Sequence, residues 1–292
     1  MTREVIQALR PFPQTVQDAV ERFVPEGRIE EIRFRIGRAM QVRTEKKTTS
    51  LPLTVTRPLL DELTDRAARR SAYAAQQMLQ NGFLILPGGH RLGLSGTAVM
   101  QNGAVQTLRL ISSANLRIAR ALPGIAEGCA ARLWTHPAST LLFGAPGSGK
   151  TTLLRDLIRL LSDRQGKRIC VVDERLELAA CLDGAPQFDL GENTDVLSGA
   201  AKECGIALLL RSMNPEWIAL DEITAAQDVE AVVRASYCGV RFLATAHAAS
   251  REELLSRPLY RSLMQVGIFR NLICIRPDHS VKIEKEGPPC SD

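Results

Sequence analysis

Aromatic residues and long apolar runs are scarce in this sequence. Only 4% of its 292 residues are Phe, Trp or Tyr, which argues against a row of stacking platforms for nucleic-acid bases. The longest purely apolar runs, such as 206–210, span a few residues, whereas a membrane-spanning helix needs about 20. The first residues also lack the apolar core of a signal peptide. We therefore expect a cytoplasmic protein and no nucleic-acid partner.

Metal-binding patterns of cysteine and histidine are missing as well. The seven cysteines are scattered and form no C-x-x-C pair, and no Cys/His spacing suggests zinc. We expect the cysteines to be small buried apolar residues.

Charge is distributed unevenly along the chain. The net charge is +5, and the basic excess lies in the first 125 residues, whereas the remainder is mildly acidic. This asymmetry predicts a docking surface for an acidic partner, nucleic acid or anionic lipid, or else an ordinary arginine-rich solvated surface.

Residues 144–151 read Gly-Ala-Pro-Gly-Ser-Gly-Lys-Thr and match the phosphate-binding loop G-x-x-x-x-G-K-[ST]. A short apolar run precedes the loop, and apolar residues at helical spacing follow it. Such a loop points several backbone N–H groups at one anion, and the helix start adds its positive dipole end. We predict that it binds ATP, with Lys150 at the β- and γ-phosphates and the Thr151 hydroxyl on Mg²⁺. The predicted cofactor-binding residues are Gly144, Ala145, Pro146, Gly147, Ser148, Gly149, Lys150, Thr151 and Thr152.

An acidic pair ends the apolar run 217–220 in the Walker B arrangement. Asp221 is predicted to hold Mg²⁺, and Glu222 is predicted to polarise the water that attacks the γ-phosphate. The alternative is that both acids cap the next helix, since acids favour helix N-termini.

Two further strand ends carry polar residues. Asp173 and Glu174 end one strand, and Glu174 is a rival candidate for the general base; alternatively Asp173 forms a structural ion pair with Arg175. His247 ends another strand and is predicted to sense the γ-phosphate or take part in catalysis, although a lone histidine is often only a structural hydrogen-bonding group.

Strand and helix patterns alternate after residue 138, which predicts an α/β domain with a mainly parallel sheet and right-handed crossovers. The first part reads as a smaller α+β domain. We expect domains at 1–120 and 138–292, with a hinge at 121–137. Over the whole chain, the expected helices include 58–80, 113–121 and 195–210. The expected parallel strands of the second domain are 139–143, 168–173, 216–221, 240–246 and 271–276.

The chain resembles the stage III sporulation protein AA family. The resemblance covers about residues 28 to 276 and rests on the phosphate loop, on Val171–Ala179, on the runs ending in Asp221-Glu222 and Ala244–Ala248, and on 30–38, 88–93 and 112–120. That family is similar to type II and type IV secretion ATPases. The resemblance implies a RecA-like P-loop NTPase domain, a homo-oligomer of hexameric form, and a mother-cell ATPase serving a membrane-embedded channel complex that leads to the forespore.

The same resemblance assigns residue roles. It matches Asp173 and Glu174 to an acidic box, His247 to a histidine box and Glu222 to the Walker B glutamate. Asp221 is a departure, because secretion ATPases usually carry glycine there.

A single domain of this kind leaves the γ-phosphate open on one side, where an arginine commonly meets the developing charge. Within 109–120 we choose Arg117 to act on a neighbouring subunit; Arg117 and Arg120 would share a face of a helix. The alternative is that these arginines pair with acids of the ATPase domain.

We therefore predict an ATPase motor that works on a membrane-embedded assembly. Two rival functions remain open. One is a RecA-like nucleic-acid-dependent ATPase, and the other is a nucleotide-gated scaffold with little turnover.

Overall fold

The computed structural model describes residues 1–23, 27–68, 81–135 and 137–285. The chain divides into two compact units: Met1–Arg120 with Cys181–Gln187, and Ala121–Ala180 with the residues from Phe188 onward. The segment expected to be a hinge holds a helix, α5 (Glu127–Thr135), which is part of the second unit. The domain limits and the hinge that we expected stay predictions.

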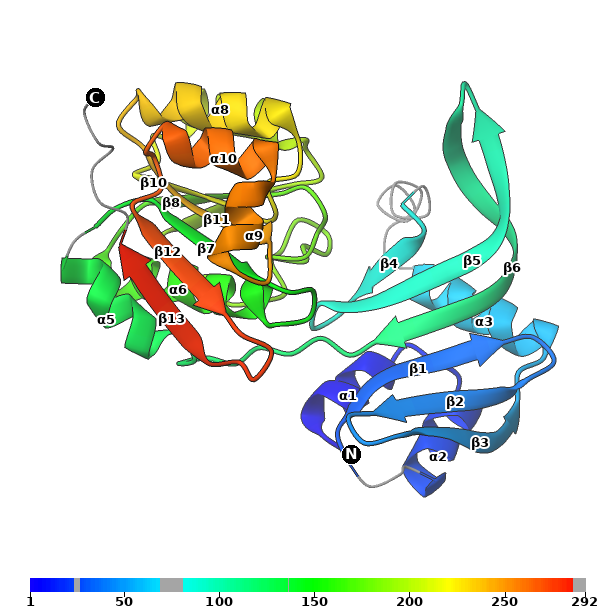
Figure 1. Cartoon of the computed structure of the whole chain (residues 1–292). Helices are drawn as coiled ribbons and strands as arrows, with labels where there is room; N and C mark the ends of the chain where they lie inside the picture. Colours follow the sequence, from blue (N-terminus) through cyan, green and yellow to red (C-terminus); the bar gives the residue numbers. More distant parts are fainter. Residues whose placement is uncertain (24–26, 69–80, 136, 286–292) are drawn as a thin grey trace. The chain divides into compact units, whose positions relative to one another are not determined.

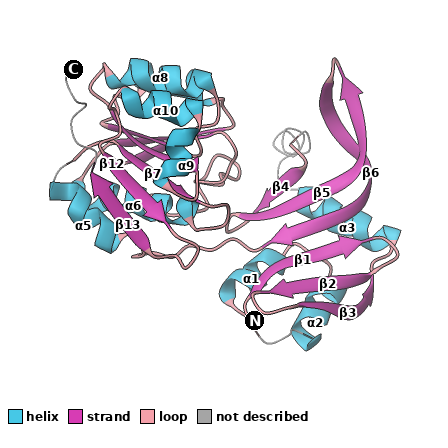
Figure 2. Ribbon diagram, in the orientation of Figure 1, coloured by secondary structure: helices cyan, strands magenta, loops and turns pink. Residues whose placement is uncertain are grey.

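The first unit is built on a six-stranded antiparallel sheet in the order β3-β2-β1-β6-β5-β4 (Figures 1 and 2). Buried apolar residues of these strands and of the helices form its core, in which Phe12 meets Phe34 edge to face with ring centroids 6.0 Å apart. The elements of this unit are α1 (Arg3–Leu9), α2 (Gln14–Phe23), β1 (Ile29–Arg35), β2 (Ala39–Thr44), β3 (Thr48–Thr54), α3 (Arg57–Ala68), β4 (Phe83–Leu86), β5 (His90–Gln101) and β6 (Ala104–Arg117).

The helix expected at 113–121 is wrong, because residues 113–117 are the end of strand β6 and 118–121 lie in no helix or strand. Ala114 and Leu116 are buried while Ser113 and Arg117 are not, which is the period of two that a strand shows. The segment pairs with β1 on one side and β5 on the other. Ala, Leu and Arg favour helices, but two neighbouring strands outweigh that local preference.

The second unit holds a seven-stranded sheet in the order β13-β12-β7-β11-β10-β8-β9. All neighbouring strands are parallel except β12 and β13. Helices cover both faces, with α8 (Ala226–Ser236) and α10 (Pro258–Gln265) on one side and α5 and α6 (Lys150–Gln165) on the other (Figures 1 and 2). The strands are β7 (Thr140–Gly144), β8 (Ile169–Asp173), β9 (Thr194–Ser198), β10 (Trp217–Leu220), β11 (Arg241–His247), β12 (Asn271–Ile275) and β13 (Val281–Lys285).

Besides α5, the helices of this unit differ from expectation between residues 194 and 212. The helix expected over 195–210 is strand β9 followed by α7, because the apolar residues of 194–198 pair with β8. Gly205 lets α7 approach the sheet, since a Cβ there would lie 2.6 Å from Val172. The remaining helices are α6 (Lys150–Gln165), α7 (Lys202–Ser212), α8 (Ala226–Ser236), α9 (Arg251–Ser256) and α10 (Pro258–Gln265).

The helix expected over 58–80 is observed as α3 up to Ala68, and residues 69–80 lie outside the described part of the chain. Across the described ranges, no helix combines the length and the apolar character needed to cross a membrane.

Candidate nucleotide-binding site

The phosphate loop joins the carboxyl end of β7 to the first residue of α6. Gly147 and Gly149 have φ angles of 78° and 95°, in the left-handed region that favours glycine. Gly144 has no room for a side chain, because a Cβ there would lie 2.5 Å from the Ile275 carbonyl oxygen and 2.5 Å from Ser148 Oγ. The glycines of the pattern thus allow the tight path that leads into the start of the helix, where backbone N–H groups are available to an anion.

Lys150 lies at the helix start and is almost fully buried, with 6% exposure. Its ammonium donates to the carbonyl oxygens of Gly144 and Ala145, both at 2.9 Å, and to Nδ1 of His247 at 3.0 Å. Burial lowers the pKa of Lys150, against the opposing effect of Glu222 and Asp221. A buried cation whose partners are two neutral carbonyls and an imidazole suits an anionic ligand such as a phosphate.

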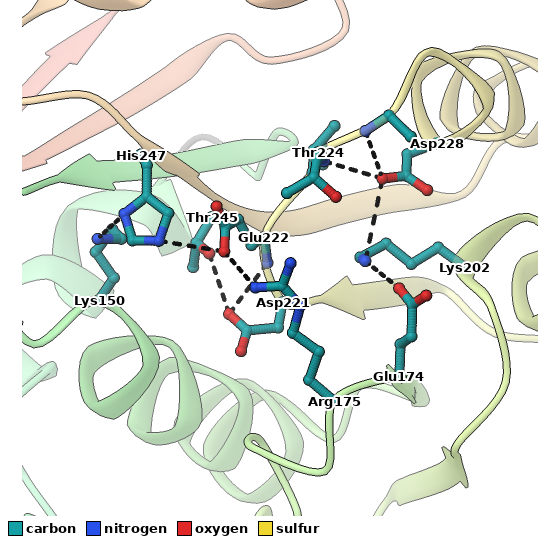
Figure 3. A network of polar contacts seen from close by, with 12 residues as sticks. Lys150, Glu174, Arg175, Lys202, Asp221, Glu222, Thr224, Asp228, Thr245 and His247 are labelled. Atoms are coloured by element: carbon teal, nitrogen blue, oxygen red, sulfur yellow. Dashed lines mark hydrogen bonds and ion pairs between the residues drawn. The ribbon is translucent and has the colours of Figure 1, made fainter. Parts of the chain in front are cut away.

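His247 and Glu222 bring two more strand ends to the loop. In the sheet, His247 at the end of β11 aligns with Gly144 at the end of β7. His247 Nε2 lies 3.1 Å from Glu222 Oε2, and the guanidinium of Arg175 donates to the same oxygen at 2.7 Å. The contacts form one chain from Lys150 through His247 and Glu222 to Arg175 (Figure 3).

Asp221 directly precedes Glu222 and is 6% exposed. Its Oδ1 accepts hydrogen bonds from the Thr245 hydroxyl and the Glu222 backbone N–H, both at 3.1 Å. Burial raises the pKa of Asp221, and the nearby carboxylate of Glu177 raises it further. A divalent cation would offset both effects, so a buried carboxylate at this strand end fits a Mg²⁺ ligand.

The other acidic pair has different partners. Asp173 is fully buried and accepts four backbone N–H groups, two on each oxygen, from residues 177–180 at 2.8–3.1 Å. Glu174 pairs with Lys202, which is 3% exposed and also lies 4.0 Å from Asp228 Oδ2. In Figure 3, Glu174 and Lys202 lie apart from the imidazole of His247. Asp173 thus fixes the loop after β8, and Glu174 neutralises a buried lysine.

The remaining predicted residues are placed as follows. Thr151 and Thr152 lie in the first turn of α6, each half-buried. Arg117 is exposed at the end of β6 in the first unit, so it does not share a helix face with Arg120. The guanidinium of Arg120 donates to the carbonyl oxygen of Ile29 within the same unit.

Three residues that contact site residues were not predicted as site residues. Arg175 was considered only as a partner of Asp173, but its described ion pair is with Glu222. No sequence pattern indicated Lys202, because a lysine at the start of a helix is typically a surface residue. His279 follows β12, and its Nδ1 lies 3.1 Å from the Ser148 carbonyl oxygen. Only its position after an apolar strand could have indicated it.

The fold and the loop define a class, the RecA-like P-loop proteins with a smaller α+β part before the nucleotide domain. The ATPase DotB of Legionella pneumophila matches with a TM-score of 0.60 at 16% identity, over 93% of this chain and 79% of that one. The pilus retraction motor PilT, solved with bound ADP, matches with a TM-score of 0.61 at 18% identity, over 89% and 76%. At these identities the likeness concerns the fold, and the predicted fold class is confirmed.

This chain belongs to the family described as Sporulation stage III, protein AA, whose sequence profile matches residues 12–283. Stage III sporulation protein AA of Bacillus subtilis (strain 168) is 37% identical to it over 266 residues, which is 88% of this chain and 86% of that protein. The family expected from the sequence motifs is confirmed.

Proposed function

We propose that this protein is an ATP-hydrolysing motor of the secretion-ATPase type that energises a membrane channel between mother cell and forespore. The family and the fold support the class of motor. The observation that supports ATP hydrolysis is the chain of contacts from Lys150, at the end of the phosphate loop, through His247 to Glu222. The proposal includes a cytoplasmic homo-hexamer that meets the membrane through its partners.

In this proposal each side chain has one task. Lys150 leaves its carbonyl partners to meet the β- and γ-phosphates. Glu222 accepts the proton of the water that attacks the γ-phosphorus, as the bond to the ADP oxygen breaks. Thr151 and Asp221 hold Mg²⁺, which when bound neutralises charge on the phosphate oxygens. His247 orients Glu222 and links its position to that of Lys150.

The experiment compares Lys150→Ala with Lys46→Ala, which removes an exposed lysine of the first unit. MgATP affinity is measured by calorimetry and turnover by phosphate release. We expect Lys150→Ala to lose binding, turnover or both, and Lys46→Ala to keep them. Persistent binding and turnover in a folded Lys150→Ala protein would overturn the site assignment.

Further measurements separate the rival functions. Phosphate release that depends on added DNA or RNA, with a steep salt dependence, would favour a nucleic-acid motor. Tight MgATP binding without turnover would favour a nucleotide-gated scaffold. Light scattering with and without MgATP tests the hexamer, and a pull-down of membrane proteins in both states tests the partner.

A further inference from the structure

The two sides of the phosphate-loop strand differ in chemistry. Strand β7 has β11 on one side and β12 on the other. The residues expected to act at the γ-phosphate lie at strand ends on the β11 side: His247 ends β11, and Asp221 and Glu222 follow β10. A nucleotide whose terminal phosphate meets these groups directs its nucleoside away from them, toward the β12 side. The residues that follow the carboxyl end of β12 are therefore candidates for contact with the nucleoside.

The turn that follows β12 places an imidazole beside the loop. Ile275, the last residue of β12, aligns with Gly144, and the turn 276–280 then leads into β13. The turn is closed by the His279 N–H donating to the Arg276 carbonyl oxygen at 2.9 Å and the Arg276 N–H donating to that of Ser280 at 3.0 Å. His279 has a φ of 63°, in a region that few residues other than glycine adopt. The ring of His279 lies beside the phosphate loop.

One edge of the His279 ring is bound to the loop. Its Nδ1 lies 3.1 Å from the Ser148 carbonyl oxygen, and since a carbonyl only accepts, Nδ1 carries the hydrogen. The same nitrogen would lie 3.7 Å from a Cβ at Gly149, so the ring borders the glycine that precedes Lys150. The residue is otherwise exposed. An oriented, solvent-facing aromatic ring therefore stands at the nucleoside end of the loop.

We propose that His279 is a nucleoside-binding residue, on whose imidazole the adenine base of ATP stacks. The proposal rests on the proposed function, because it assumes that the loop holds the triphosphate. Every base has a π-face, and stacking of that face on an aromatic side chain contributes to affinity. Stacking uses the face of the imidazole, so it needs no hydrogen bond between His279 and the base. The bond to Ser148 fixes the ring before the base arrives and so reduces the entropy lost on binding.

A purely structural role must be told apart from base binding. If His279 only holds the loop, its loss weakens every ligand that has a triphosphate. If it binds the base, its loss weakens ATP and leaves inorganic tripolyphosphate unaffected. His279→Asn keeps a side-chain N–H donor and tolerates a positive φ, but it removes the ring. His279→Phe keeps a ring and removes the donor.

The experiment measures dissociation constants of ATP and of tripolyphosphate, both with Mg²⁺, by calorimetry. We expect His279→Asn to weaken ATP about tenfold or more and tripolyphosphate less than about twofold. His279→Phe should keep ATP within about threefold, and Ser280→Ala, a control on the same turn, should match the unsubstituted protein.

Three results would overturn the proposal. Equal weakening of both ligands in His279→Asn would make the residue a holder of the loop, and no weakening of either would leave it without a role. Loss of ATP affinity in His279→Phe, with affinity kept in His279→Asn, would assign the effect to the donor. The proposed function fails separately, if the unsubstituted protein binds neither ligand or if binding survives Lys150→Ala.

Discussion

Lys150 Nζ lies 3.0 Å from Nδ1 of His247, and this contact determines which hydrogen the imidazole carries. An ammonium group only donates, so Nδ1 accepts and the ring hydrogen sits on Nε2, which faces Glu222 Oε2 at 3.1 Å. Glu222 therefore receives donors from both His247 and Arg175. Because one ring joins the loop lysine to the proposed base, a movement of Lys150 toward a phosphate would free the Nδ1 acceptor of His247, while Nε2–H can still donate to Glu222.

The first prediction separates the two candidate bases. Glu222→Gln should bind MgATP but hydrolyse it more slowly by about 10²-fold or more, because an amide cannot accept the proton of the attacking water. Glu174→Gln should retain much more turnover, because the Glu174 carboxylate is paired with Lys202. Single-turnover phosphate release with saturating MgATP measures both. A larger loss in Glu174→Gln would reverse the assignment.

Asp173 supports a second prediction. An asparagine has one acceptor oxygen where the carboxylate has two, and Asp173 accepts four backbone N–H groups with those two oxygens. Asp173→Asn should therefore lose about 2 kcal/mol or more of unfolding free energy, since buried donors are left without an acceptor. Urea unfolding followed by circular dichroism measures this loss.

Asp183→Asn is the matched control, because Asp183 is an exposed aspartate with a positive φ that asparagine tolerates. Its unfolding free energy should change by less than about 0.5 kcal/mol. Unchanged stability in Asp173→Asn, together with lost turnover, would instead make Asp173 a residue of the reaction.

The third prediction concerns pH and His90 in the first unit. His90 is 1% exposed, its Nδ1 accepts the Ala119 N–H at 3.0 Å, and burial lowers its pKa to about 4. The unfolded chain takes up this proton near pH 6.5, whereas the folded chain does so only near pH 4. Folding stability should therefore fall as the pH drops from 6.5 to 4, by up to about 3 kcal/mol from this group.

His90→Asn is the test, because an amide oxygen can accept the Ala119 N–H without titrating. We expect the variant to lose less unfolding free energy than the unsubstituted protein between pH 6.5 and pH 4, measured in urea at several pH values. Parallel curves for the two proteins would show that His90 does not titrate in this way.

Sequence patterns predicted the features that depend on residues close together along the chain. The glycines, Lys150 and the helix after them lie within a few residues, and an apolar strand followed by Asp221 and Glu222 is equally local. Contacts between segments that are distant in the sequence could not be predicted from these patterns. The segment ending at Arg117 reads as a helix until β1 and β5 pair with it, and Arg175 meets Glu222 only because β8 and β10 are adjacent.

The burial of a charge was equally hidden. Lys202 is 3% exposed, although its sequence position is typical of a surface lysine at a helix start. Its burial follows from two carboxylates, Glu174 and Asp228, which come from separate elements. A sequence shows which residues are charged, but the fold determines which charged groups are buried away from solvent.

The last prediction is a site completed by a neighbouring subunit. Arg117 is exposed at the end of β6, whereas the guanidinium of Arg120 is bonded to the Ile29 carbonyl. We therefore keep Arg117 as the arginine that meets charge developing on the γ-phosphate, which is worth about 10³-fold or more in rate. Arg117→Ala should bind MgATP normally and hydrolyse it far more slowly in phosphate-release assays.

Mixing two inactive proteins tests whether Arg117 acts between subunits. Lys150→Ala keeps Arg117 but lacks a working loop, and Arg117→Ala keeps the loop but lacks the arginine. A mixed ring places an intact arginine beside an intact loop, so phosphate release should return only in the mixture. The control mixes Lys150→Ala with Arg109→Ala, an exposed arginine elsewhere on β6, whose own activity should be near normal. Inactive mixtures that still co-assemble, or full activity in a monomer, would show that the site is complete within one chain.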